Sequence, residues 1–276
     1  NDPYLLGKIA ANHALGDLFA MGATPHSALA LVTLPYAPPE ILEEELFLLM
    51  SGAIEVLEEN NMSLVGGHSG EGSDMAFGLN VNGFVAKESM MTKSGLAADE
   101  VLILTKPLGT GILLAANMRH KAKGRWIEEC IAAMLNSNKN GAQIFQEHGA
   151  KACTDITGFG LLGHLYEMLK ASNIEAHIDL SSLPVLSGVY KLTKQGIFSS
   201  LQEENIRLEH IIAASDGLIK EKNYPLLFDP QTAGGLLAGV AANKVQQCLE
   251  QLHRFGYPDA VIIGHIQKRQ HADYFV

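Results

Sequence analysis

Two carboxylates in this sequence have surroundings in which they could hold a metal ion. Asp17 follows His13 by four residues in a helical pattern, so both side chains project from one helix face. The small residue Gly16 leaves room for a ligand or another backbone to come close. A His–Asp pair at this spacing is more often a local hydrogen bond than a metal site. Asp17 is therefore a candidate metal ligand only if a second carboxylate meets it, and Asp155 is the candidate for that role.

The glycine-rich segment Gly66–Gly72 has the composition of an anion-binding loop. Its backbone N–H groups could cradle phosphate oxygens, and the hydroxyl of Ser69 could add a donor. It is not a Walker A loop, because no lysine follows its glycines. We expect a short strand at residues 63–65 that runs into this loop. The alternative is that the glycines serve a turn that needs positive φ angles.

A third segment, Gly158–Gly163, matches the dinucleotide-binding pattern G-x-G-x-x-G. Asp179 follows at about the distance at which such sites place an acid on the ribose. Asp155 argues against this interpretation, because a bare carboxylate just before the glycines repels a pyrophosphate. The same carboxylate attracts phosphate when it holds a magnesium ion. NAD binding is thus the least favoured function. The alternative explanation of this motif is that its glycines allow a helix to pack closely against a strand.

The segment Asp229–Gly235 begins with Asp-Pro and ends with Gly-Gly, which predicts a tight turn before an apolar strand. A structural turn explains it at least as well as a direct catalytic role. The sequence contains no Gly-x-Ser-x-Gly or HExxH motif. It also offers no Cys/His pair in a context that suits nucleophilic catalysis.

Composition excludes several classes of protein. The chain has 276 residues, a formal charge of −10 and 47% apolar residues, which is enough for a substantial core. An acidic chain is a poor partner for nucleic acid or for an anionic membrane surface. No apolar run approaches the ~18 residues of a transmembrane helix. Three cysteines without a CxxC motif suit a reducing compartment, so we expect a cytoplasmic protein.

Helical and strand patterns alternate along the chain and favour an α/β or α+β class. Asp2-Pro3 is typical of a helix start, as an N-cap acid followed by proline. We place a domain boundary in the connection after the fifth element, so that the domains are 1–90 and 91–276. The expected helices run from Pro3 to about Met21, from Pro38 to about Asn60, from about Trp126 to His148 and up to about Ala171; the expected strands are 27–34, 63–65, 76–85, 101–105, 176–180 and 260–263.

Six motifs, in order and over nearly the whole chain, resemble one family: selenophosphate synthetase, also called selenide, water dikinase. The two longest are the most specific, and agreement of all six by chance is negligible. The motifs are Asp2–Tyr4, Ala14–Gly22, Gly66–Ser69, Leu104–Gly109, Thr154–His164 and Asp229–Leu237.

The resemblance implies a two-domain fold like that of the aminoimidazole ribonucleotide synthetase superfamily, and a homodimer. It implies the reaction of ATP, selenide and water to selenophosphate, AMP and phosphate, with magnesium. By position, Asp17 would bind magnesium and nucleotide, and Asp155 would bind magnesium. Gly67, His68 and Ser69 would contact the phosphates of ATP.

The sequence also departs from the family. The chain begins at Asn1 without Met, and the family's N-terminal glycine-rich loop with its reactive Cys or selenocysteine has no counterpart here. We therefore expect an incomplete N-terminal domain, catalytic residues upstream of Asn1, and a chain that does not complete the dikinase reaction alone. His13 stands where the family usually has Asn, and Gly16 where it usually has Ser. A non-catalytic or regulatory dimerising domain of a larger fused protein is one alternative. Another ATP-using enzyme of the superfamily is the second.

Overall fold

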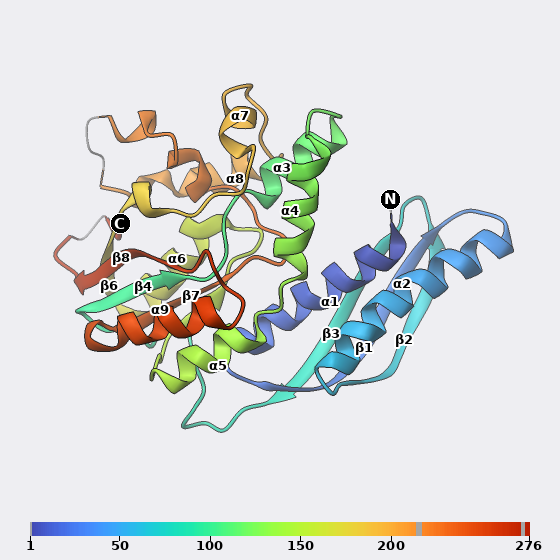
Figure 1. Cartoon of the computed structure of the whole chain (residues 1–276), viewed down its shortest axis with the longest axis horizontal. Coiled ribbons are helices and arrows are strands. Elements are labelled where there is room, and N and C mark those ends of the chain that lie inside the picture. Colours follow the sequence, from blue (N-terminus) through green and yellow to red (C-terminus); the bar gives the residue numbers. More distant parts are fainter. Residues whose placement is uncertain (1, 214–216, 272–273) are drawn as a thin grey trace.

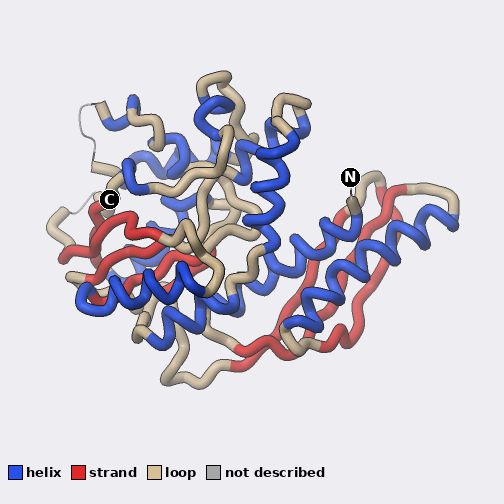
Figure 2. Tube along the Cα trace, in the orientation of Figure 1, coloured by secondary structure: helices blue, strands red, loops and turns tan. Residues whose placement is uncertain are grey.

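Two separate β-sheets organise the chain, as seen in a computed structural model that describes residues 2–213, 217–271 and 274–276 (Figures 1 and 2). The strands are β1 Thr24–Pro35, β2 Ser63–Gly72, β3 Ala76–Phe84, β4 Glu100–Leu104, β5 Cys153–Asp155, β6 Ile174–Ile178, β7 Leu236–Ala241 and β8 Val261–Lys268. The α-helices are α1 Pro3–Ala20, α2 Pro39–Glu59, α3 Thr110–Met118, α4 Gly124–Leu135, α5 Lys139–Glu147, α6 Gly160–Ser172, α7 Val189–Thr193, α8 Gln202–Asn205 and α9 Val245–Arg254. Within these ranges, no helix has the length and apolar character needed to cross a membrane.

The N-terminal unit is a three-stranded sheet, in the order β2-β1-β3, with α1 and α2 on one face (Figure 1). The predicted start of α1 is confirmed, since the Asp2 side chain accepts a hydrogen bond from Leu5 N at 3.1 Å. Residues of β1 alternate between a buried and an open face, as period-two patterning predicts. Leu29 and Leu31, on the open face, are 40% and 60% exposed. One side of this sheet is thus covered by helices, and the other is not.

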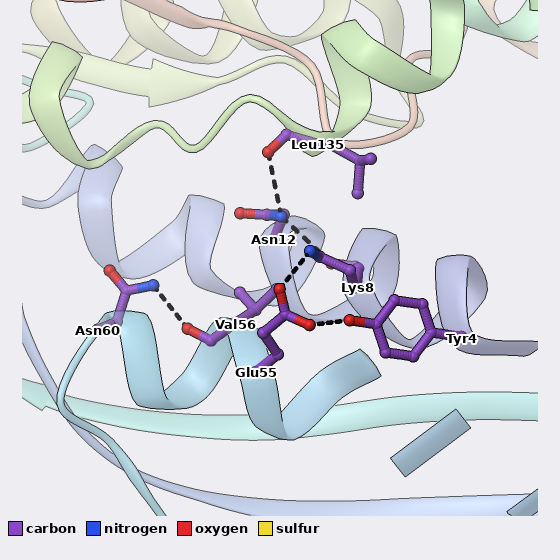
Figure 3. Close-up of polar contacts among 7 residues, drawn as sticks. All are labelled: Tyr4, Lys8, Asn12, Glu55, Val56, Asn60 and Leu135. Carbon is purple, nitrogen blue, oxygen red and sulfur yellow. Dashed lines mark hydrogen bonds and ion pairs between the residues drawn. The ribbon is translucent and has the colours of Figure 1, made fainter. Parts of the chain in front are cut away.

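The two N-terminal helices cross at very short range. A Cβ added to Gly7 would lie 2.0 Å from the Leu49 carbonyl oxygen, and one added to Gly52 would lie 2.0 Å from that of Tyr4. Any side chain at either position would therefore push the helices apart. Beside this crossing, Glu55 of α2 accepts hydrogen bonds from Tyr4 Oη and Lys8 Nζ of α1 (Figure 3).

The C-terminal unit is a five-stranded sheet, in the order β5-β7-β4-β8-β6, and every neighbouring pair is antiparallel. This is the α+β form of the expected fold class. Both faces are covered: in β4, Leu102 and Leu104 join a core with α3, α4 and α6, whereas Ile103 joins a second core with α5 and α9. Burial on both faces explains why β4 and β7 are almost continuously apolar.

Helix α1 belongs to both units. Its residues Ala11, Leu15 and Phe19 lie in the same core as α5, α9 and the second face of the five-stranded sheet. In addition, Asn12 Nδ2 donates to the carbonyl of Leu135 at the end of α4, at 3.4 Å (Figure 3). The units therefore pack as one body through α1, and this packing sets where the remaining residues of α1 point.

Two predicted elements differ from the structure. Residues 66–72 are not a loop, because β2 continues to Gly72 and pairs in parallel with β1. The single helix predicted at 126–148 is two helices, α4 and α5. Polar contacts hold the break between them: Asn138 Nδ2 donates to Gly234 O at 2.9 Å, and Lys106 Nζ donates to Asn136 O at 2.5 Å.

The crossing of α1 and α2 gives the first prediction. Gly52→Ala should lower the free energy of unfolding by about 1–3 kcal/mol, because the added methyl group collides with a helix backbone that cannot move freely. Urea denaturation measures the change. The control is Gly124→Ala in α4, where a Cβ meets nothing within 4 Å. We expect that change to stay within about 0.5 kcal/mol, and equal effects of the two variants would contradict the prediction.

Candidate functional site

The structure brings Asp17 and Asp155 together at the junction of the two units. Asp155 ends β5, and Asp17 lies in the last turn of α1. At Gly16 the backbone of α1 lies directly against Asp155, since a Cβ on Gly16 would lie 2.5 Å from Asp155 Oδ2. Gly16 thus lets the α1 backbone approach the carboxylate directly, which Ser, with its own Cβ, would not allow in this geometry.

Asp155 is a carboxylate in an unfavourable environment. It is 6% exposed, and its pKa is raised to about 6, first by burial and then by the negative charge of Asp17. The positive charges of Lys93 and Lys106 act against this shift but do not cancel it. A cation between the two carboxylates would relieve the repulsion.

Lys106 is a site residue that the sequence analysis did not single out. It is 4% exposed, and its Nζ donates to the carbonyl oxygens of Ala233, at 3.0 Å, and of Asn136. Burial lowers its pKa to about 7, and the charge of Asp155 opposes this. Its place in the family motif Leu104–Gly109 is the signal that could have identified it, because residue type alone predicts an exposed lysine. Leu104 and Thr154 both pair with Leu237, so the carboxyl ends of β4 and β5 lie on either side of β7, at the same end of the sheet.

His13 connects α1 to the segment 229–235. Its Nδ1 accepts a hydrogen bond from Ala233 N at 3.0 Å. The ring is therefore in the neutral form with its proton on Nε2. Removal from water lowers the pKa of His13, although part of the ring remains exposed, and the charge of Asp17 opposes the shift. The sequence analysis considered a metal pair or a local hydrogen bond between His13 and Asp17. The hydrogen bond that His13 makes is instead to Ala233, a partner that neither alternative included.

The segment 229–235 is held by hydrogen bonds that begin helix α3. Gln231 Oε1 accepts from Gly109 N, Thr110 N and Thr110 Oγ1, at 3.1–3.2 Å. Gln231 Nε2 donates to Asp229 Oδ2 at 2.9 Å. Asp229 is fully buried, and burial raises its pKa to about 7. These contacts favour the structural interpretation of the motif, since they satisfy the free N–H groups at the start of α3.

A cavity of 590 Å³ opens beside His13, between α1, α3 and the segments at 158 and 199–201. Its polar lining includes His13, Arg119, Ser199, Ser200 and Thr232. Because the Nδ1 of His13 is engaged, the ring has its Nε2–H donor left for a ligand. The cavity therefore offers several donors and one full positive charge beside His13, which precedes Asp17 by one helical turn.

Gly67, His68 and Ser69 lie elsewhere, on the edge strand β2. They pair with Ala30, Leu31 and Val32 of β1 and are exposed. Among the described residues, no hydrogen bond, ion pair or close contact joins them to Asp17 or Asp155. In a parallel edge strand, alternate N–H groups point away from the sheet. Those outward groups, and the imidazole of His68, are what β2 offers to a ligand.

The dinucleotide interpretation of Gly158–Gly163 does not fit the topology. A dinucleotide fold needs parallel neighbouring strands on either side of the helix, but β5 and β6 lie at opposite edges of an antiparallel sheet. Asp179 instead caps a turn, accepting from Ser181 N at 2.9 Å and Ser181 Oγ at 2.7 Å. At Gly160 (φ +69°) a Cβ would meet the Leu227 carbonyl oxygen at 2.9 Å, so packing explains this glycine.

The donor set fits magnesium rather than a metal held by protein ligands alone. Within the described ranges, no three Asp, Glu, His or Cys side chains gather closely enough to hold an ion. Magnesium is commonly bound by one or two carboxylates together with substrate phosphates. Asp17 and Asp155 supply that number. The three thiols do not take part, because burial raises the pKa of Cys130 and of Cys248 to about 12 and that of Cys153 further.

Comparison with known proteins identifies the family. Residues 1–85 match the N-terminal domain of AIR synthase related proteins, and residues 97–276 match the C-terminal domain. The selenide, water dikinase of Porphyromonas gingivalis is 37% identical over 268 residues, which are 96% of this chain and 75% of the relative. The chain belongs to the selenide, water dikinase family. A second member, from Caldanaerobacter subterraneus subsp. tengcongensis, is 35% identical over 277 residues, covering all of this chain and 79% of the relative.

The fold is also that of solved structures in the superfamily. Thiamine-monophosphate kinase from Stenotrophomonas maltophilia K279a aligns with a TM-score of 0.74 and 18% identity, covering all of this chain and 81% of that one. The two-domain aminoimidazole ribonucleotide synthetase-like fold expected for selenide, water dikinases is therefore confirmed.

The contact between His13 and Ala233 gives the second prediction. His13→Phe should lower the free energy of unfolding by about 1–3 kcal/mol, because Ala233 N, in a buried residue, loses its acceptor. His13→Asn keeps a side-chain oxygen as an acceptor at this position, so its free energy of unfolding should fall clearly less than that of His13→Phe. Urea denaturation of the two variants side by side measures the difference. Equal losses would show that the ring packs without a useful hydrogen bond.

Proposed function

We propose that this chain binds ATP with magnesium at the junction of its two units. The observation that carries the proposal is the packing of α1 at Gly16 against Asp155, with the negative charge of Asp17 near enough to raise the pKa of Asp155. Asp17 and Asp155 would hold the ion, and Asp17 would also lie beside the nucleotide. When bound, magnesium neutralises phosphate charge and aligns the group that is transferred.

The cavity beside His13, one helical turn from Asp17, suits a polyphosphate. His13 lines this cavity together with Arg119, the C-cap residue of α3. Hydroxyl groups of Ser199, Ser200 and Thr232 add further donors. These groups would bind and orient phosphate oxygens, while burial of Asp155 keeps bulk water away from one side of the ion.

Gly67, His68 and Ser69 complete the proposal as phosphate contacts. The support for this role is the family motif together with the free edge of β2, where outward N–H groups and the His68 ring are accessible. Because these residues lie on the edge strand β2, whereas Asp17 lies on α1 and Asp155 on β5, they would bind a different part of the nucleotide from the two carboxylates.

The reaction we propose is the family's own: ATP, selenide and water give selenophosphate, AMP and phosphate. The family membership supports it, as does a site built for charge neutralisation rather than for covalent catalysis. The reacting selenium would have to reach the phosphates from the cavity side, because Asp155 and Lys106 are closed in by β4, β5 and segment 229–235.

The third prediction tests nucleotide binding. A non-hydrolysable ATP analogue at 100 times its Kd should add about 2.7 kcal/mol of stability, or about 5 °C in Tm, only when magnesium is present. Asp155→Asn should abolish the shift. Because the pKa of Asp155 is about 6, protons compete with magnesium below that pH, so the shift should shrink from pH 7.5 to pH 5. Asp179→Asn serves as the control and should keep the full effect.

Two results would count against this site. A magnesium-dependent shift that survives Asp155→Asn would place the ion elsewhere. A shift that grows as the pH falls would contradict the titration of Asp155. His68→Ala separates the second part of the proposal, because it should weaken nucleotide binding without removing the magnesium dependence.

We also propose that two copies of the chain associate through the open face of the N-terminal sheet. Leu31, Val65 and Phe84 on its strands are 60%, 64% and 69% exposed. Strands β1 and β3 contain no Asp, Glu, Lys or Arg, so their part of the face carries no formal charge, and the exposed polar side chains of β3 are the neutral Asn80 and Asn82. An identical face meets it without charge repulsion, as a two-fold symmetric interface requires.

The fourth prediction concerns this association. Leu31→Asp should convert a dimer into a monomer of unchanged fold, because it places one carboxylate opposite its symmetry mate in an apolar contact. Light scattering after size-exclusion chromatography measures the mass, and circular dichroism checks the fold. Phe47→Asp, on the exposed side of α2, is the control and should leave the dimer intact. A wild-type chain that is monomeric at high micromolar concentration would refute the proposal.

A reducing compartment fits the three cysteines, which are all buried and unpaired. We propose the cytoplasm as the site of action on this ground.

A further inference from the structure

Two histidines lie opposite each other near one edge of the five-stranded sheet. His177 of β6 and His265 of β8 are direct partners in an antiparallel pair, so both side chains lie on the same face. Strand β6 forms one edge of the sheet (left in Figure 1), and β5, which ends at Asp155, forms the other. Four inter-strand spacings, or roughly 19 Å, separate the two edges. The histidine pair is therefore outside the proposed nucleotide site.

Both imidazole rings are accessible and unengaged. His265 also pairs with Val101 of β4, whose side chain packs against the core shared with α5 and α9. The pair lies on that face of the sheet, yet both histidines are exposed, so the helices leave this end of the face open. Within the part of the chain that the structure describes, neither ring makes a hydrogen bond or an ion pair. The nitrogens of both rings are thus available to a ligand.

The separation of the two rings suits a shared metal ion. Their centroids lie 5.1 Å apart, and the ring planes are inclined at 33°. Zinc–nitrogen bonds are about 2.0 Å long, and a tetrahedral ion bonded to one nitrogen of each imidazole places the ring centres about 5 Å apart. A turn about the Cβ–Cγ bonds, which is a soft motion for histidine, brings one nitrogen of each ring toward such an ion. The strands therefore already hold the rings at the required spacing.

A carboxylate beside the pair makes the position more favourable for a cation. Asp179 follows β6 directly, two residues after His177. Hydrogen bonds from Ser181 are the main cause of the lowered pKa of Asp179, and the proximity of His177 adds to the effect. Asp179 is not a third ligand, since among the described residues no three such side chains gather closely enough. The remaining coordination positions of the ion belong to water.

We propose that His177 and His265 bind one divalent cation of the zinc type, through one nitrogen of each ring. Imidazole is a preferred ligand of zinc and its neighbours in the first transition row, whereas magnesium prefers oxygen. The ion joins the edge strand β6 to β8 and so stabilises the outer edge of the sheet. It occupies the opposite edge from Asp155 and does not compete for the carboxylates there.

The fifth prediction uses Zn²⁺ alone as the probe. Added to the untagged full chain at pH 7.5, it should shift the amide NMR signals of residues 176–178 and 264–266. Mg²⁺ at the same concentration should leave these signals unchanged. Loss of an outer-sphere partner alone commonly costs roughly tenfold or more in metal affinity. His177→Asn and His265→Asn, which each remove a ligand, should therefore weaken zinc binding at these strands at least roughly tenfold.

Further variants distinguish a shared ion from two independent surface histidines. The double variant should bind little more weakly than either single one, because one substitution already breaks the two-point attachment. Independent sites would instead lose affinity at only the substituted ring. His120→Asn removes an exposed histidine after α3, at a φ of +54° that asparagine tolerates, and should leave these shifts unchanged. Asp155→Asn should also leave them unchanged.

Two results would overturn the proposal. One is the absence of zinc-induced shifts in both strands of the wild-type chain. The other is a single variant, at either histidine, whose remaining ring binds zinc as tightly as the pair does.

Discussion

The peptide groups of Ala233 hold the two units of this chain in register. Its N–H donates to His13 of α1, and its carbonyl accepts from the buried Lys106 at the end of β4. The residue has a φ of +46°, a left-handed conformation that costs a non-glycine residue about 1–2 kcal/mol. Contacts on both sides maintain that conformation. Together with the core formed by Ala11, Leu15 and Phe19, these two hydrogen bonds hold α1 against the C-terminal unit and so set where Asp17 lies relative to Asp155.

The same arrangement forces a carboxylate into a place where ionisation is expensive. Burial and a neighbouring negative charge both raise the pKa of Asp155. Such strain is typical of functional sites, where part of the stability of the fold is given up for binding. Lys106 limits the cost, since its positive charge acts against the rise in the pKa of Asp155.

The sequence was sufficient where local patterns decide the structure. The N-cap at Asp2 and the alternation along β1 predicted their elements, and the meeting of Asp17 with Asp155 was a stated condition that the structure meets. It was insufficient where distant contacts decide. Glycines carry no alternating pattern, so β2 looked like a loop. The break at Asn138 depends on a carbonyl 96 residues away. Glycine spacing alone, finally, cannot show that β5 and β6 lie at opposite edges of the sheet.

The core that α1 shares with α5 and α9 has a consequence for how this architecture can change in evolution. Ala11, Leu15 and Phe19 pack among residues from the other unit, while Gly16 fits one particular carboxylate. If the N-terminal unit were replaced by that of a relative, the side chains of the new α1 would therefore not fit the surface of this C-terminal unit. The two units can diverge only together, by matched changes on both sides of α1. Proteins whose domains meet through polar linkers commonly exchange whole domains during evolution. In this chain the core shared through α1 opposes such an exchange.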